Sequence, residues 1–500
     1  MSTSSPTSHR ALSRRRSIVA LLATGGLVLA ACGSPEGSGG DGPGRAADGD
    51  GDAVELPECP LDALEEATGP VEVNLWYGGI VEPPVGVLND LIDDFNASQD
   101  QIVVTGNDQG TSYDEVLRQY ERTASTPDQL PEIIYMEDSA LGQLVDRGQL
   151  LPAQSCMEAD GYDMDQLVPA ARSAGEVDGV LYPGYMNVSS PVLYYNQAHF
   201  QAAGLDPDNP PQTLDELEEA ARQIQDAGVS PRPLSFKTSQ WFFQTWIGGL
   251  GQDMVNNDNG RSEPATEARF DTPETRDVMG WLADMNSEEL LNPFPETDGG
   301  IDHYLALVTE QSSMLIETST ASGTIAQALG GDLTAEEAGV DVDQALLESA
   351  NLVPASAQLP GIEEPGRVAA SGGYFYLLNT GSPAQQAASW KFLQFMLEAE
   401  NAKKWHIDGG YLPVVESVLD DPDVVEFQET DLGGLLLAPS AEQMAAADPD
   451  EAPPLIGPFT AYKDALQGAM EGVLFSGEDP AESLTSANDT MNEALESYNE

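Results

Sequence analysis

The sequence predicts an α/β protein with two or more lobes, and three observations lead to this prediction. The chain has 500 residues, which is long for a single hydrophobic core. Hydrophobic residues make up 41% of the chain and charged residues 21%, so most of it should be globular. Stretches with strand patterns alternate with stretches that have helical periodicity. This order predicts parallel strands joined by crossover helices.

The alternation begins at residue 71. The segment VEVNLW (71–76) alternates apolar and polar residues, as a half-buried strand does. In GVLNDLIDDFNAS the apolar residues recur at helical spacing. QIVVTG and LPEIIYM are predicted as the next strands, with the helical segment YDEVLRQYERTA between them.

A second run of the same pattern starts at SSPVLYYN. In the helix that follows, Thr213 and Glu216 are predicted to form a capping box, and Gly228 is predicted to end the helix. Further along, Ser382 caps a helix with Pro383 in its first turn, and AQQAASWKFLQFMLEAENAKKW is predicted as one long helix. No internal repeat is present.

The net charge excludes one class of partner. The chain carries 20 basic and 84 acidic residues, a formal net charge of −64. Such a surface repels phosphate backbones and anionic membranes, so we expect no nucleic-acid binding. Self-repulsion favours a soluble monomer.

The N-terminus has the pattern of an export signal. Arg10 and the arginines at 14–16 precede a short apolar run that ends in LAAC, which resembles a bacterial lipobox and predicts lipidation at Cys32. Residues 1–31 are then a signal peptide, residues 32–60 a flexible Gly/Ser/Asp-rich tether, and the protein is exported and lipid-anchored on the outer face of the cell membrane. An ordinary export signal remains the alternative, and SRRRSIV leaves a twin-arginine route open. Outside the membrane the remaining cysteines, Cys59 and Cys156, favour a disulfide over two free thiols.

The common catalytic motifs are absent. There is no Gly-x-Ser-x-Gly, no phosphate-binding Gly-Lys-Ser/Thr and no His-Glu-x-x-His, and the cysteines lack zinc-site spacing. NNDNGRSE resembles a calcium loop but has Val255 at the first ligand position, so we predict a hairpin turn there. His199, His303 and His406 are interpreted as ordinary polar residues. We therefore expect no metal and no cofactor.

Aromatic and small polar residues follow three predicted strands, in LWYGG, TSYDE and YMEDS. Ligands of open α/β sheets bind at the carboxyl ends of strands. Tyrosine and tryptophan faces stack on sugar rings, and carboxylates and hydroxyls bind sugar hydroxyls. Loop residues that only cap the strands are the alternative.

Several segments resemble extracellular solute-binding proteins of sugar-type ABC importers. They are SSPVLYYN, AGLDPDNPPQT and WKFLQFMLEAENAKKWHIDGGYLP, and DFNASQD, SYDEVL and VDRGQLLP match in the same order. Within this class, the sequences of these segments most resemble binding proteins for glycerol-3-phosphate and glycerophosphodiesters. The resemblance runs from about Val71 to the C-terminus.

The resemblance implies a two-lobed clam-shell fold with crossing hinge segments, which closes on its ligand and docks on the membrane permease. Lobe I would comprise residues 61–186 and 354–372, and lobe II residues 187–353 and 373–500. Crossings are expected near 186–189, 353–356 and 371–374.

The resemblance also implies a set of ligand-binding residues. To these we add Trp76 because it ends the first strand, with a core tryptophan as the alternative. The residues carried over are Tyr113, Glu137, Ser189, Trp241, Ser319, Gly372 and Tyr411. In WHIDGGYLP, Trp405 and His406 would finish the long helix and the two glycines would make a turn, which leaves Tyr411 as the binding residue.

One departure from the resemblance bears on the ligand. The glycerol-phosphate relatives hold the phosphate with an arginine late in the chain, where this chain has Leu455 or Ile456. Lys463, the nearest cation, is expected on a helix surface. The preferred ligand is therefore a neutral sugar, oligosaccharide or polyol, with glycerol-3-phosphate or a glycerophosphodiester as the alternative. Two alternative hypotheses come from other functional classes. One is a surface-anchored glycosidase, and the other is a sensor domain or adhesin.

Overall fold

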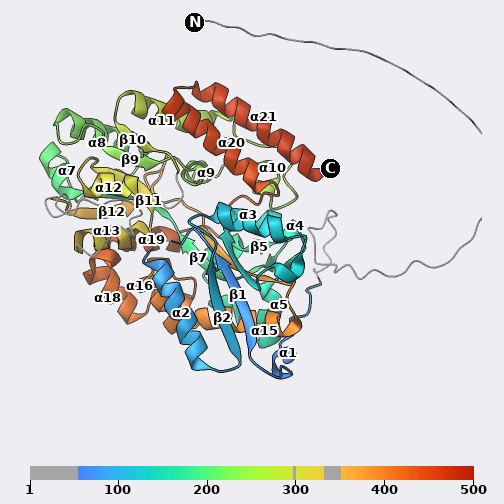
Figure 1. The fold of residues 1–500 in the computed structure, drawn as a ribbon. Coiled ribbons are helices and arrows are strands. Elements are labelled where there is room, and N and C mark those ends of the chain that lie inside the picture. Colours follow the sequence, from blue (N-terminus) through green and yellow to red (C-terminus); the bar gives the residue numbers. More distant parts are fainter. Residues whose placement is uncertain (1–54, 81, 297–299, 331–350) are drawn as a thin grey trace, which may run out of the picture. The chain divides into compact units, whose positions relative to one another are not determined.

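The computed structural model describes residues 55–80, 82–296, 300–330 and 351–500. The predicted signal peptide, Cys32 and most of the predicted tether lie outside these residues. Two β-sheets organise the described chain, and each is covered by its own helices (Figure 1). In the same described ranges no helix has the length and apolarity needed to cross a bilayer.

The first sheet has six strands in the order β2-β1-β3-β13-β4, with β7 also paired to β13. β1 runs parallel to β2 and β3, whereas β13 runs antiparallel to β3, β4 and β7. The strands are β1 (Val71–Tyr77), β2 (Ile102–Asp108), β3 (Ile133–Glu137), β4 (Leu150–Leu151), β7 (Pro183–Ser189) and β13 (Ser371–Leu378). A short hairpin lies outside this sheet and consists of β5 (Glu176–Val177) and β6 (Val180–Leu181).

The predicted strands of this sheet are confirmed, and β1 shows why the pattern works. Its buried residues alternate with exposed or partly buried ones, so the apolar face lies on the core. Helices from both ends of the chain belong to this lobe. They are α1 (Asp62–Glu65), α2 (Pro84–Ser98), α3 (Tyr113–Thr123), α4 (Leu141–Asp146), α5 (Ala153–Asp160), α6 (Pro169–Ala174), α15 (Pro383–Met396) and α16 (Ala399–Ile407).

The second sheet has five strands in the order β10-β9-β11-β8-β12. β9, β10 and β11 are parallel, and β8 is antiparallel to both β11 and β12. The strands are β8 (Pro191–Asn196), β9 (Leu234–Lys237), β10 (Leu291–Phe294), β11 (Met314–Thr318) and β12 (Pro354–Gln358).

Most remaining helices surround this second sheet, and α20 and α21 lie side by side beyond it (Figure 1). The helices are α7 (Gln197–Ala203), α8 (Leu214–Asp226), α9 (Gln240–Gly248), α10 (Asn256–Gly260), α11 (Pro273–Ser287), α12 (Asp302–Val308), α13 (Ala321–Gly330), α17 (Glu416–Leu419), α18 (Pro422–Thr430), α19 (Leu432–Ala445), α20 (Phe459–Glu471) and α21 (Pro480–Asn499).

Sheet membership corrects the predicted lobe boundaries. The chain passes from the first sheet to the second at Ser190, close to the predicted crossing at 186–189. Residues 354–358, assigned to lobe I, form β12 of the second sheet. Residues 373–378, assigned to lobe II, pair with β3 and β7 of the first sheet. The return passage therefore spans 359–370, not 353–356, and the predicted crossing at 371–374 lies inside β13 of the first sheet. Strand order depends on long-range pairing, which local patterns do not specify.

Three local predictions are also corrected. The predicted long helix breaks at Glu398, whose backbone is extended, so that it forms two helices, α15 and α16. Thr213 caps α8 as predicted, but the Glu216 carboxylate accepts from the backbone N–H of Gln212 instead of closing a capping box. NNDNGRSE forms a short left-handed turn, with positive φ at residues 257–259, rather than a plain hairpin.

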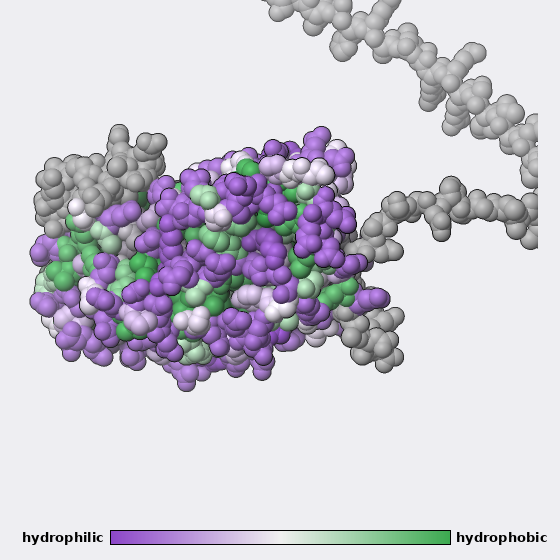
Figure 2. Space-filling model, turned by 90° about the horizontal axis from the view of Figure 1, so that it is seen from below, coloured by the Kyte–Doolittle hydropathy of each residue, from purple (hydrophilic) through white to green (hydrophobic). Residues whose placement is uncertain are grey.

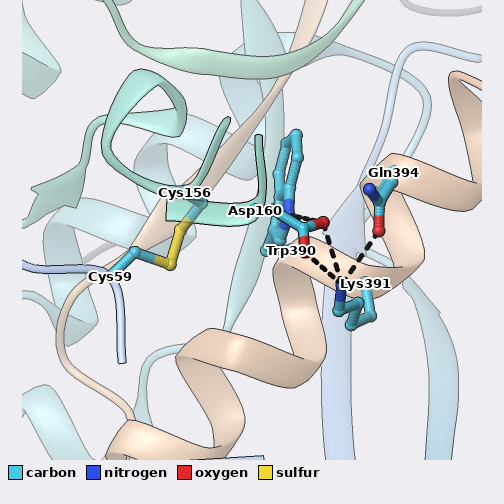
Figure 3. The surroundings of a disulfide bond; sticks show 6 residues. All are labelled: Cys59, Cys156, Asp160, Trp390, Lys391 and Gln394. Atoms are coloured by element: carbon cyan, nitrogen blue, oxygen red, sulfur yellow. Dashed lines mark hydrogen bonds and ion pairs between the residues drawn. A yellow bond between two sulfur atoms is a disulfide. The ribbon is translucent and has the colours of Figure 1, made fainter. Parts of the chain in front are cut away.

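Cys59 and Cys156 form a disulfide that joins the start of the described chain to α5 (Figure 3). One turn further along α5, Asp160 accepts hydrogen bonds from Lys391 Nζ (2.8 Å) and Trp390 Nε1 (3.1 Å) of α15. Burial alone raises the pKa of Asp160, but these hydrogen bonds outweigh it and lower the pKa. The N-terminal segment is thereby held against lobe I, next to an ion pair that joins α5 and α15.

The molecular face drawn in Figure 2 is largely hydrophilic, with smaller apolar areas between the polar ones. Most charged side chains of the sequence are acidic. Large aromatic side chains are buried in the core beneath, among them Trp246, Trp390 and Trp405. This division between core and surface is what the composition predicts.

Candidate functional site

A cavity of about 230 Å³ lies among the loops that follow strands of both sheets. From the first lobe, Tyr113 lies at the start of α3, Glu137 ends β3, and Gly372 is the second residue of β13. From the second lobe, Lys237 ends β9 and Thr318 ends β11. Carboxyl ends of strands therefore form the site, as the α/β pattern predicts.

Small polar side chains dominate the rest of the lining. Ser112 and Ser239 cap α3 and α9, where their hydroxyls accept from backbone N–H groups. The hydroxyl-bearing serines and threonines that line the cavity are Thr111, Ser112, Ser189, Ser239, Thr318, Thr320, Thr324 and Ser371. Tyr113, Trp241, Tyr304 and Tyr411 add aromatic surface. Aromatic faces beside hydroxyl groups suit a polyhydroxylated ligand.

The structure brings six of the eight predicted site residues to this cavity. They are Tyr113, Glu137, Ser189, Trp241, Gly372 and Tyr411.

Trp76 and Ser319 do not line the cavity. Trp76 lies within β1, paired with Asn107 and Ile134, and packs against the core, while Gly79 beyond the strand end lines the cavity. Ser319 is fully buried and exchanges hydrogen bonds with the backbone of Ser190, so it secures the passage between the sheets.

A buried hydrogen-bond network holds the two cavity tyrosines of the first lobe. Tyr135 Oη lies 3.0 Å from Tyr113 Oη and accepts from Asn187 Nδ2 at 2.8 Å. It also shares a hydrogen bond with the Tyr411 hydroxyl. Trp405 Nε1 donates to Asn187 Oδ1, and its ring stacks on Tyr411 at 5.6 Å. Burial raises the pKa of all three tyrosine hydroxyls, so they stay protonated and can donate.

Two glycines make room for this network. A Cβ on Gly372 would lie 2.0 Å from the carbonyl oxygen of Asn187, and φ of Gly372 is +153°. A Cβ on Gly373 would lie 2.1 Å from the ring of Tyr135. Because both contacts are far below van der Waals distance, β13 can pair with its neighbours here only with glycine at these two positions.

His406 supports Tyr411 from behind. It is fully buried, and burial lowers its pKa to about 4, so the ring is neutral. Its Nδ1 donates to the Tyr411 carbonyl at 2.7 Å, and its Nε2 accepts from Gln428 at 3.2 Å. The turn at Gly410, with φ of +72°, follows as predicted. His406 is thus outside the cavity but fixes the backbone of a residue that lines it.

Charged side chains form two balanced groups in the cavity wall. Lys463 Nζ lies 3.0 Å from Asp114 Oδ2, and Glu137 and Glu296 are also near it. Burial lowers the pKa of Lys463, but attraction to these carboxylates outweighs it and raises the pKa. Burial raises the pKa of Glu137 to about 8, although Lys463 opposes this. The prediction that Lys463 lies on a helix surface is therefore wrong.

The second charged group centres on Glu317. Its Oε2 accepts from His303 Nε2 at 2.6 Å and lies 3.8 Å from Lys237 Nζ. Burial alone raises the pKa of Glu317, but Lys237 and His303 outweigh it and bring the pKa to about 2. Burial lowers the pKa of His303, so a neutral imidazole donates to a carboxylate whose charge Lys237 balances. No group of three or more potential metal ligands is present among the described residues.

Sequence reasoning missed Lys237 and Glu317 and placed Lys463 on a helix surface. The carboxyl-end rule could have found Lys237 and Glu317, because Lys237 ends the strand LSFK and Glu317 is the second-last residue of the strand MLIET. Lys463 carries no such signal, since it lies within helix α20. Leu455 and Ile456 are buried and do not line the cavity.

Comparisons with known proteins agree on the fold and the family. A family model of bacterial extracellular solute-binding proteins matches residues 90–430. The sn-glycerol-3-phosphate-binding periplasmic protein UgpB of Brucella melitensis is 25% identical over 370 residues, which cover 72% of this chain and 78% of that protein.

Two solved structures show the fold. UgpB of Mycobacterium tuberculosis, in complex with glycerophosphocholine, has a TM-score of 0.68 at 17% identity and covers 86% of this chain and 99% of its own. The cyclic α-maltosyl-1,6-maltose binding protein of Arthrobacter globiformis has a TM-score of 0.64 at 24% identity, with 86% and 100% covered. The two-lobed α/β fold predicted from the sequence is confirmed.

Proposed function

Because this chain belongs to the bacterial extracellular solute-binding proteins, we propose that it captures a sugar, oligosaccharide or polyol for an ABC importer. The observation that carries the ligand class is the cavity lining, in which four aromatic side chains lie among eight serines and threonines. Ligand binding between lobes closes such proteins, and the closed form docks on the membrane permease.

The charges of the cavity favour a neutral ligand over a phosphoester. Each lysine of the lining already faces a carboxylate, Lys237 facing Glu317 and Lys463 facing Asp114. Glu296 adds further negative charge to the lining. A phosphate needs a fixed cation or several backbone amides, and here it would compete with these carboxylates. The names of the UgpB relatives favour glycerol-3-phosphate or glycerophosphocholine as the second candidate.

The ligand class can be tested by calorimetry on the chain from Gly33 onward, after a thermal-shift screen. The panel contains glucose, maltose, ribitol, glycerol-3-phosphate and glycerophosphocholine. We expect saturable one-to-one binding of at least one neutral compound and a ligand-dependent rise in Tm. Tight binding of a phosphoester with no binding of the neutral compounds would refute the neutral-ligand proposal.

We further propose that the protein performs no reaction. A glycosidase of the same surface location would also bind saccharides, so turnover separates the two. Incubating excess maltose and cellobiose with the protein should leave both intact by chromatography. Accumulation of glucose, abolished by Glu137→Gln or Glu317→Gln, would instead identify an enzyme.

We also propose that the mature protein is a monomer held to the outer face of the cell membrane by a lipid on Cys32. Metabolic labelling with palmitate in the source bacterium tests this. The wild-type chain should incorporate label and sediment with membranes, and Cys32→Ala should do neither. Label in the Cys32→Ala variant would place the lipid elsewhere.

A further inference from the structure

A second cavity of about 190 Å³ adjoins the first. The two cavities share two lining residues, Trp241 and Ser371. The second is bounded by α9, by the segment that contains α10, by the return passage between the sheets, and by the segment before α20. We call the first cavity the front chamber and the second the rear chamber.

The side chain between the chambers is held in place from the first lobe. Trp241 Nε1 donates to Ser371 Oγ at 2.9 Å, and Ser371 Oγ donates to Asp138 Oδ1 at 3.1 Å. Asp138 is buried. The chain of hydrogen bonds thus runs from the first lobe through β13 to α9 of the second lobe. It fixes an indole that lines both chambers, and an indole is a good stacking surface for a sugar ring.

The rear chamber has polar groups, and carboxylates outnumber arginines in its described lining. Arg367 pairs with Glu451 at 2.6 Å. Arg261 donates to backbone carbonyls, including that of Pro453 at 2.7 Å. Amide side chains and carboxylates complete the polar part, and Met254, Val368 and prolines supply apolar surface. This mixture suits a neutral polyhydroxylated group rather than an anion.

The volumes of the chambers indicate how much of the ligand each can hold. Ligand pockets usually have volumes of roughly 300–1,000 Å³. Each chamber alone lies below this range, whereas the two together lie within it. We propose that the ligand spans both chambers and is a saccharide of at least two linked units, with Trp241 at the junction. This inference rests on the proposed function and narrows it, because a single monosaccharide or small polyol would fill only one chamber.

Gly248 offers a direct test. It lines the rear chamber at the end of α9, and a Cβ added there meets no atom within 4 Å. Gly248→Phe should therefore plug the rear chamber without straining the backbone, and Gly248→Leu provides a smaller plug. Gly280→Phe is the matched control, because Gly280 lies in α11, lines neither chamber and also faces open space.

The assay is calorimetric titration of each variant with glucose, galactose, maltose, cellobiose, maltotriose and cellotriose. Tm values without ligand report whether each variant folds. In the wild type we expect at least one di- or trisaccharide to bind more than tenfold tighter than its monosaccharide. Gly248→Phe should abolish that gain and leave monosaccharide affinity within about twofold, Gly248→Leu should reduce it, and Gly280→Phe should match the wild type.

Three results would overturn the inference, and they distinguish its failure from failure of the proposed function. If saccharides bind without dependence on length, or if both Gly248 variants fold and keep the full gain, the rear chamber takes no part while the proposed function stands. If the wild type binds none of these saccharides and binds glycerol-3-phosphate or glycerophosphocholine instead, the proposed ligand class itself is wrong.

Discussion

Tyr135 is the centre of the network beneath the front chamber, and Tyr135→Phe removes only its hydroxyl. That oxygen accepts from Asn187 Nδ2 at 2.8 Å and lies 3.0 Å from Tyr113 Oη. Asn187 is fully buried, so without this partner its amide loses a hydrogen bond that water does not replace. An unsatisfied buried donor costs about 1–3 kcal/mol. We therefore expect the free energy of unfolding to fall by about 2 kcal/mol.

The same change should weaken ligand binding, because Tyr113 and Tyr411 both lose an orienting hydrogen bond. We expect about a tenfold loss of affinity, which corresponds to about 1.4 kcal/mol. Urea unfolding followed by circular dichroism measures the stability, and calorimetry with the tightest saccharide measures the binding.

Tyr185→Phe is the matched control for this experiment. Tyr185 is also buried in the first sheet, on β7, but it does not line the cavity. Its variant should retain wild-type affinity. The reasoning also predicts non-additivity: in a Tyr113→Ala background, Tyr135→Phe should cost less affinity than it does alone. Equal losses for Tyr135→Phe and Tyr185→Phe, or strict additivity, would refute the positioning role.

Three further predictions follow from named contacts. Glu137 has a pKa raised to about 8, so as pH rises the unfolded chain releases this proton before the folded protein does. The stability should therefore fall as pH rises from about 4.5 through 8. The decline of Tm over that window should be shallower in Glu137→Gln than in the wild type, and parallel Tm curves for the two proteins would contradict this. Replacing Cys59 and Cys156 with serine opens a loop with a sequence separation of 97 and should lower the free energy of unfolding by about 2–5 kcal/mol. A reductant should destabilise the wild type to the same extent and should have no effect on the double variant. Tyr113→Ala should weaken saccharide binding by about 1–3 kcal/mol with little change in Tm, whereas Tyr411→Ala should also lower Tm, because its ring stacks on a buried tryptophan.

The local rules of the sequence were sufficient for most elements of the fold. Alternation in VEVNLW predicted β1, and Ser382 with Pro383 predicted the start of α15. These signals depend on residues within one or two turns of each other, so they can be recognised without the tertiary structure. The break at Glu398 has no proline or glycine to announce it. It allows Trp390 to reach Asp160 while Trp405 reaches Asn187.

The candidate site likewise combines residues that the sequence could predict with side-chain directions that it could not. Tyr113 and Glu137 were predictable because Glu137 ends a strand and Tyr113 begins the helix after one, and parallel strands bring their carboxyl ends together. Ser319 occupies a similar position, yet its side chain points to Ser190 rather than into the cavity. A position along the chain tells which end of the sheet a residue occupies, but the packing decides which way its side chain points.

By itself, the sequence determined the fold class, the caps and strand ends, and a resemblance that identified a two-lobed solute-binding protein. Only the tertiary structure decided that residues 354–358 and 373–378 exchange lobes relative to the prediction, that Lys463 faces Asp114 across 349 residues of chain, and that Trp241 stands between two chambers. The physical reason is the sequence separation of the residues that interact. Periodicity and capping arise from neighbours along the chain, whereas strand order, charge pairing and cavities arise from residues that meet only after the chain has folded.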